Sequence, residues 1–154
     1  MSEPKFNLDE DSLSQASPVE PLVVEPQLPI RQVFELLKEK KTGSLLVARG
    51  GVLEGLFTER DALNVIADGI SLDEPIESVM SKSPVTIEAG KSIGTAIKQM
   101  SAGGYRRLPI VRPDGSTEGM IKVSGIVNYL VEHFPSAVYN LPPARPKMND
   151  REGA

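Results

Sequence analysis

Cysteine is absent from the 154-residue sequence, and histidine occurs only once, as His133. Without thiols the chain has no disulfide, no thiolate nucleophile and no Cys-ligated metal site, and one histidine leaves no pair at metal-ligand spacing. Apolar runs such as LLVA and IVNYLV are far shorter than the ~20 residues that span a membrane. The acidic start MSEPKFNLDEDS resembles neither a secretory signal nor a transit peptide. We therefore expect a cytoplasmic protein with no membrane partner.

The sequence also has no excess of basic residues. Its acidic excess lies near the start of the chain, and the rest is close to neutral. Residues 1–27 contain six acidic residues and one basic residue, whereas residues 28–142 contain 13 of each. A neutral body with 5% aromatic residues lacks the basic stripe or stacking platform of a nucleic-acid surface, so we expect no nucleic acid partner. The first 18 residues are polar and acidic, which predicts a disordered leader, and the tail PPARPKMNDREGA predicts the same.

The chain does contain an internal repeat. The stretch PLVVEPQLPIRQVFELL begins at Pro21 and matches PVTIEAGKSIGTAIKQM, which begins 63 residues later at Pro84. Both stretches open with a short β-type triplet and continue into apolar residues at helical spacing. These residues are Ile30, Val33, Phe34 and Leu37 in the first copy, and Ile93, Ala96, Ile97 and Met100 in the second.

The match continues through two strands and a second helix in each copy. SLLVA from Ser44 and RLPIV from Arg107 are short apolar runs typical of buried strands. Further strands start at Gly55 and Gly119, 64 residues apart, and lead into the apolar helices ALNVIA and IVNYLV. The segment DEPIESVMSKS predicts a short turn or helix between the copies.

The fold class is therefore α+β, with two strand–helix–strand–strand–helix repeats packed with pseudo-twofold symmetry around one core. We assign residues 1–18 to the disordered leader, 19–72 to repeat 1, 73–131 to the linker and repeat 2, and 132–154 to a C-terminal appendage and flexible tail. Apolar residues of the appendage suggest packing on the module or on a second subunit, with a surface-hugging tail as the alternative. These residues are Phe134, Val138, Tyr139 and Leu141.

The motif GLFTERD, from Gly55 to Asp61, is a strand that ends in Thr58 and is followed by a helix start. Thr58 as the N-cap and Asp61 at the third helical position form a capping pattern, which is a sufficient structural explanation of both residues. The functional alternative is that both side chains accept hydrogen bonds from a ribose diol, because a carboxylate offers two acceptor oxygens.

The motif GYRRLPIV places Arg106 and Arg107 together at the start of a buried strand. Neighbouring strand residues point to opposite faces, so one arginine can meet solvent while the other faces the cleft between the repeats. An ordinary charged strand edge explains the pair equally well. The functional alternative is a phosphate clamp, because one guanidinium group can donate two hydrogen bonds to two oxygens of a phosphate.

Catalytic signatures are missing: the sequence has no G-x-S-x-G elbow, no metal-ligand spacing and no paired carboxylates of a cleft type. We therefore expect a binding module and no enzyme.

Taken together, the duplicated unit, VMSKSPVTI, GLFTERDAL and YRRLPIV followed by Gly119 resemble the cystathionine-β-synthase (CBS) domain pair, or Bateman module. The resemblance covers roughly residues 20–131. It implies a regulatory sensor, often a homodimer, for adenosine compounds such as AMP, ADP, ATP or S-adenosylmethionine, with no other cofactor.

The resemblance also implies roles for individual residues. In this family the hydroxyl and carboxylate of the strand–helix turn hold the ribose, and these map onto Thr58 and Asp61. Basic residues of the partner repeat reach the phosphates, a position that Arg106 and Arg107 occupy. The base is lined by the segment before the first helix and by the second strand, here Leu22, Val23, Ser44 and Leu45.

The second repeat departs from this pattern, because Lys122 stands where the first has Thr58, and Gly125 stands where it has Asp61. It therefore lacks a ribose carboxylate, and Lys122 can add positive charge near the phosphates. We predict one adenine-nucleotide site per chain, in a stand-alone module that signals to an unknown protein target through its conformation or dimer geometry. The rival hypothesis is a dimerisation or scaffold protein that binds no ligand.

Overall fold

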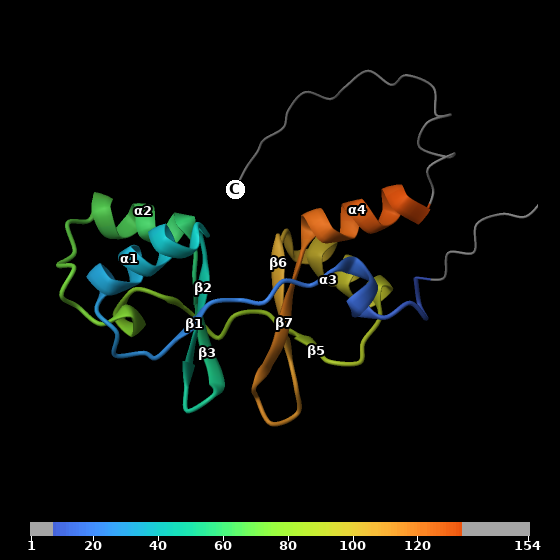
Figure 1. Ribbon diagram of the computed structural model, residues 1–154, viewed down its shortest axis with the longest axis horizontal. Coiled ribbons are helices and arrows are strands. Elements are labelled where there is room, and N and C mark those ends of the chain that lie inside the picture. Colours follow the sequence, from blue (N-terminus) through green and yellow to red (C-terminus); the bar gives the residue numbers. More distant parts are fainter. Residues whose placement is uncertain (1–7, 134–154) are drawn as a thin grey trace, which may run out of the picture. The chain divides into compact units, whose positions relative to one another are not determined.

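The computed structural model describes residues 8–133, which form two compact units (Figure 1). One unit contains residues 20–88 and 109–119, and the other contains residues 8–19, 89–108 and 120–133. Within residues 8–133 no helix is both long and apolar enough to cross a membrane.

The first unit is built on a four-stranded sheet in the order β1-β2-β3-β4. Its strands are β1 (Val23–Val24), β2 (Leu45–Arg49), β3 (Val52–Phe57) and β4 (Ser81–Lys82). Strand β1 runs parallel to β2, and the other two pairs are antiparallel. The β2–β3 turn consists of Gly50 and Gly51, whose φ angles of 58° and 87° favour glycine.

Both helices of this unit lie on the same side of its sheet, as Figure 1 shows. They are α1 (Ile30–Lys40) and α2 (Glu59–Ala67), and the short 3-10 helix η2 (Ile76–Ser78) follows them. The predicted apolar face of α1 is confirmed: Ile30 and Val33 are fully buried, and Phe34 and Leu37 pack against the same cluster. The rest of the buried cluster comes mainly from the strands and α2: Val24, Leu45, Val47, Phe57, Val65 and Ile76.

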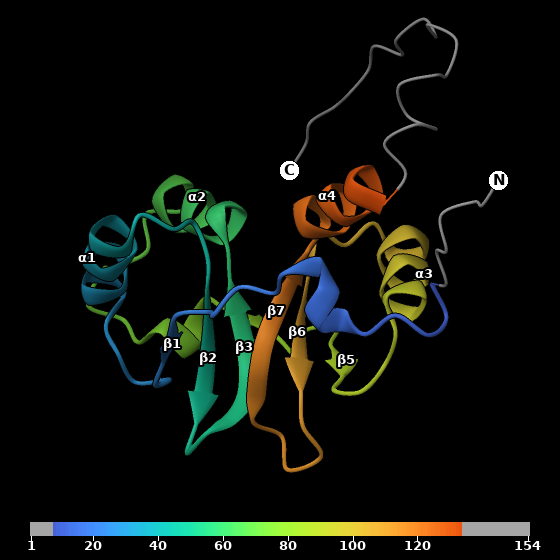
Figure 2. The ribbon, with the colours of Figure 1, turned by 45° about the vertical axis from the view of Figure 1, so that its right-hand side comes forward.

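The second sheet has three strands in the order β5-β6-β7. They are β5 (Ile87–Glu88), β6 (Arg107–Val111) and β7 (Thr117–Lys122), and β5 runs parallel to β6. Two helices, α3 (Ile93–Gly103) and α4 (Val123–His133), lie on one side of β6 and β7 (Figure 2). Their buried residues include the predicted Ile93, Ala96 and Met100 of α3, together with Ile126 and Tyr129 of α4.

The leader differs from its predicted disorder in residues 8–18. Here the chain forms the 3-10 helix η1 (Leu13–Ala16), whose Leu13 and Ala16 are buried where η1 contacts α3 and α4. The backbone amides of Ile93 and Gly94, at the start of α3, donate to carbonyl groups of this segment at 2.9 and 2.8 Å. Two apolar side chains and these hydrogen bonds are enough to order a segment that is otherwise polar.

The predicted α+β fold class is confirmed, since two strand–helix–strand–strand–helix repeats follow one another along the chain. The linker is the predicted short helix, η2, and β4 follows it. The predicted C-terminal appendage, with Phe134, Val138, Tyr139 and Leu141, lies outside the described residues.

Candidate functional site

The turn between β3 and α2 places a hydroxyl and a carboxylate at the end of the first sheet. Thr58 is the N-cap of α2, and together with Asp61 it forms the predicted capping box. The Thr58 amide donates to Oδ2 of Asp61 at 3.0 Å, and the Thr58 hydroxyl lies 3.4 Å from the same oxygen. Both side chains are half-buried, so the carboxylate is fixed in place while part of it still faces solvent.

A third group also reaches the Asp61 carboxylate. The hydroxyl of Ser81, on the edge strand β4, lies 3.2 Å from both Oδ1 and Oδ2. Ser81 follows Asp61 by 20 residues and is exposed. The carboxylate therefore connects the start of α2 to the linker between the repeats.

The residues predicted to line the base gather at this same end of the sheet, but their side chains differ in burial. Leu45 pairs with Phe57 across β2 and β3, and Val23 pairs with Leu46 across β1 and β2. Leu22 is half-buried and Val23 is 44% exposed, so both are accessible. Leu45 is fully buried in the core and Ser44 nearly so, so Leu45 presents no surface at this end of the sheet and Ser44 very little.

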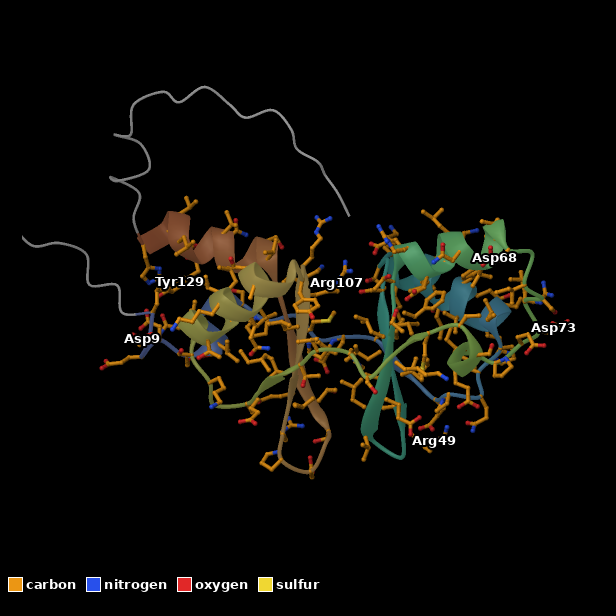
Figure 3. The ribbon with its side chains drawn as sticks, turned by 180° about the vertical axis from the view of Figure 1, so that it is seen from behind. Asp9, Arg49, Asp68, Asp73, Arg107 and Tyr129 are labelled. Atoms are coloured by element: carbon orange, nitrogen blue, oxygen red, sulfur yellow. The ribbon has the colours of Figure 1, made fainter. Side chains whose placement is uncertain are left out.

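The predicted basic residues gather at one end of the second sheet. Arg107 begins β6 and Lys122 ends β7, and the amide of Val123 donates to the carbonyl oxygen of Arg106 at 2.9 Å. Arg106 is exposed and Arg107 half-buried, as expected for neighbours on opposite faces of a strand. Figure 3 shows the Arg107 side chain at the end of β6.

The two groups of residues belong to different compact units, so their meeting in one cleft stays a prediction. Thr58, Asp61, Ser44 and Leu22 are part of the unit with residues 20–88, whereas Arg106, Arg107 and Lys122 are part of the other.

The strand–helix turn of repeat 2 is closed by the leader. A Cβ atom added to Gly125 would lie 2.4 Å from the carbonyl oxygen of Ala16, so the backbone of η1 fills the space beside this glycine. Beside it, Val19 and Met120 exchange backbone hydrogen bonds of 2.9 Å in both directions. Where repeat 1 has a carboxylate, repeat 2 therefore has a main-chain carbonyl of its own chain.

A second contact holds the leader on α4. The hydroxyl of Tyr129 donates to the carboxylate of Asp11, and the Tyr129 ring stacks 4.1 Å from the ring of His133. Figure 3 labels Tyr129 on α4 and Asp9 on the leader. Burial, reinforced by the hydrogen bond to Asp11 and by the charge of that residue, raises the pKa of Tyr129 to about 12.

One hollow beside the first sheet lies away from these residues. It has a volume of about 540 Å³ and is lined by Leu53, Glu54, Glu77, Ser78, Met80, Lys82 and Ser83. Arg49 bridges two of its acidic residues, with distances of 3.0 Å to Glu54 and 2.8 Å to Glu77. Because Leu53 and Glu54 lie in the first half of β3, the hollow is at the other end of that strand from Thr58.

Sequence reasoning missed Ser81 and the leader residues Ala16 and Val19. The strand register of the structure relates the two segments: Ser81 pairs with Leu56, and Val19 pairs with Met120, which is the residue 64 positions after Leu56. The leader thus occupies in repeat 2 the place that the linker occupies in repeat 1. Among residues 8–133 no group of three or more His, Cys, Asp or Glu side chains is arranged to hold a metal ion.

Comparison with known proteins agrees with this duplicated architecture. A family model described as "CBS domain" matches residues 16–68 and 76–132. The CBS domain-containing protein YhcV of Bacillus subtilis is 36% identical over 89 residues, which is 57% of this chain and 64% of that protein. The chain thus spans just under two thirds of this relative.

Solved structures show the same fold. A CBS domain protein from Pyrobaculum aerophilum, complexed with AMP, has a TM-score of 0.69 at 20% identity, over 79% of this chain and 96% of that one. A CBS domain pair in complex with 5′-methylthioadenosine and S-adenosyl-L-methionine has a TM-score of 0.68 at 17% identity, over 77% of this chain and 98% of that one.

Proposed function

Because the chain belongs to the CBS domain family, we propose that it is a regulatory module that binds an adenosine-containing ligand of the AMP, ADP or ATP class. The ligand occupies one site per chain, with its ribose on Thr58 and Asp61. Binding changes the conformation or the dimer geometry of the module, and a protein target responds to that change. The role is regulatory and not catalytic, and the expected location is the cytoplasm.

The observation that carries this proposal is the carboxylate of Asp61. The capping box fixes its position at the end of β3, and a half-buried carboxylate with two acceptor oxygens suits a pair of neighbouring hydroxyl groups. The accessible Leu22 and Val23 lie at the same end of the sheet and supply apolar surface for a base.

The phosphates are assigned to Arg106, Arg107 and Lys122, which cluster at one end of the second sheet. Guanidinium and ammonium groups form charge-assisted hydrogen bonds to phosphate oxygens. The structural neighbours that contain AMP or S-adenosyl-L-methionine support a ligand of this class. Gly125 carries no carboxylate and is covered by Ala16, which supports a single ribose site.

A homodimer is proposed from the exposed faces of α2 and α4. Leu63 and Ile66 of α2 are 70% and 63% exposed, and Val127 of α4, which matches Leu63 in the repeat, is 51% exposed. Exposed apolar side chains on regular helices favour association with a partner surface. The same observation supports the second candidate function, a dimerisation or scaffold protein that binds no ligand. Sedimentation equilibrium of the full chain measures the mass, and a monomer at micromolar concentration contradicts the dimer.

A thermal-shift panel tests the ligand. The wild-type protein is heated with AMP, ADP, ATP, adenosine or S-adenosylmethionine, alongside Asp61→Asn and a matched control, Asp68→Asn. Asp68 lies at the other end of α2, where it is exposed. A ligand at 100 times its Kd stabilises the fold by about 2.7 kcal/mol, which raises Tm by several degrees.

We expect a shift in the wild type and in Asp68→Asn that is lost in Asp61→Asn. A shift that persists in Asp61→Asn would show that this carboxylate is only a helix cap. No shift with any of the ligands at millimolar concentration would favour the scaffold function.

A further inference from the structure

The position of Ser81 on the Asp61 carboxylate suggests how ligand binding is transmitted, on the assumption that the proposed function is correct. A serine hydroxyl has one proton, yet the Ser81 oxygen lies 3.2 Å from both carboxylate oxygens. The single proton is therefore shared between two acceptors or given to one of them. A ribose diol has two hydroxyl protons and can donate one to each carboxylate oxygen. We therefore expect the diol to bind this carboxylate in preference to the Ser81 hydroxyl.

Besides this contact, Ser81 is held by its pairing with Leu56, while its neighbour Met80 packs against the core cluster and the Ser83 amide donates to the Glu54 carbonyl oxygen at 3.2 Å. Strand β4 contains two exposed residues and forms two pairs with β3, Leu56 with Ser81 and Gly55 with Lys82. The next residue, Ser83, has a φ of 50°, which is unfavourable for a residue with a side chain. A short edge strand of this kind separates from its sheet at low cost.

The segment is also the covalent connection between the repeats. Only a few residues separate Lys82 from β5, which begins at Ile87. Strand β4 is therefore only four residues away from the first strand of repeat 2.

We propose that Ser81 is a positioning residue that couples the site to the linker. In the ligand-free chain its hydroxyl holds β4 on Asp61. The ribose hydroxyl groups of a bound nucleotide replace it, and β4 is released from β3.

Binding to two nucleotides tests the competition. AMP and 2′,3′-dideoxy-AMP, which lacks the diol, are titrated calorimetrically into the wild type, Ser81→Ala and Ser78→Ala. Ser78 is the matched control, because it is an exposed serine of the same linker whose hydroxyl donates to the carbonyl oxygen of Pro75. Since an exposed hydrogen bond is lost, Ser81→Ala is expected to bind AMP about two- to fivefold more tightly and dideoxy-AMP unchanged. Ser78→Ala should leave both affinities unchanged.

Hydrogen exchange supplies a readout that affinity does not. We expect AMP to increase deuterium uptake in residues 79–84 of the wild type, and Ser81→Ala to show the increased uptake without ligand. Weaker AMP binding by Ser81→Ala, with decreased uptake in this segment, would overturn the proposal and make Ser81 a ligand contact. Equal affinity and uptake in the two proteins would also overturn it, while leaving the proposed function intact. Absence of binding of AMP, ADP and ATP to the wild type would remove both, and if ADP or ATP binds in place of AMP, that nucleotide and its 2′,3′-dideoxy form are the pair compared.

Discussion

The two strand–helix turns of this chain match in their buried residues and differ at the surface. Phe57 and Ile121, which are 64 residues apart, are both fully buried. Val65 and Tyr129, also 64 residues apart, are each 1% exposed. Between them, Thr58 is replaced by Lys122 and Asp61 by Gly125. The groups beside the two turns differ too, because a linker serine contacts Asp61 and a leader carbonyl covers Gly125.

This difference separates what folds a repeat from what gives it a site. The buried positions keep their apolar character because each sheet must bury one face under its helices. The turn is free to change, since either a capping carboxylate or a neighbouring backbone can complete it. One turn offers charged oxygen atoms to solvent, and the other uses the equivalent space for internal packing.

The largest expected effect comes from giving the second turn a side chain. Gly125→Ala places a methyl group 2.4 Å from the Ala16 carbonyl oxygen, which belongs to backbone and cannot rotate away. We expect a loss of about 2 kcal/mol of stability and a fall in Tm of several degrees, measured by thermal unfolding.

Helix propensity works in the opposite direction, because alanine is favoured over glycine inside a helix by about 1 kcal/mol. Ser124→Ala, an exposed neighbour on α4, is the control and should change stability by less than about 0.5 kcal/mol. A higher Tm for Gly125→Ala would show that the leader does not close this turn.

A smaller effect is expected from removing the positive charges that repeat 2 is proposed to offer to the phosphates. The joint substitution Arg106→Ala and Arg107→Ala removes two phosphate ligands that repeat 2 is proposed to supply. We expect calorimetric affinity to fall by about tenfold or more for ATP, less for AMP, and least for adenosine, because charge-assisted hydrogen bonds are lost in proportion to the phosphates. Arg31→Ala, which removes an exposed ion pair with Asp73, is the control. Equal losses for adenosine and ATP would contradict the phosphate assignment.

An effect that appears only at high pH concerns the matched helix positions Val65 and Tyr129. The pKa of Tyr129 is raised from 10 to about 12, so the folded chain keeps a proton that the unfolded chain releases. The stabilisation is complete below pH 10 and is lost as the pH rises toward 12. Urea unfolding between pH 9 and 12 should show this decline in the wild type, and a shallower decline in Tyr129→Phe. Equal slopes in the two proteins would contradict the raised pKa of Tyr129.

Much of the fold was predictable because it is periodic. Ile30 and Val33, like Ile93 and Ala96, repeat at helical spacing, and the spacing of Thr58 and Asp61 predicts the cap that is present. The leader was not predictable in this way, since its few apolar residues, Leu8, Leu13 and Ala16, are widely separated in a polar segment and do not define a helical or strand period.

The site was predictable only in part. Ser81 lies in a polar linker, and a serine there has no pattern that distinguishes a carboxylate contact from a solvent contact. Leu45 follows the pattern of a strand, but the pattern does not show that its side chain is wholly in the core. The proximity of Asp61 to Arg106 and Arg107 is still a prediction, because local sequence does not encode the distance between two units.

The packing of the leader has a consequence for the order of events during synthesis. Asp11 and Tyr129 are 118 residues apart, so residues 8–19 leave the ribosome long before the helix on which they rest. The unit built mainly from residues 20–88 has most of its partners at hand earlier in synthesis. The side chains of Leu13 and Ala16 therefore stay exposed to solvent until α4 has been synthesised. Contacts between residues so far apart in the sequence also form slowly. In a nascent chain Leu13 and Ala16 are therefore exposed to other partners until the ribosome has synthesised α4.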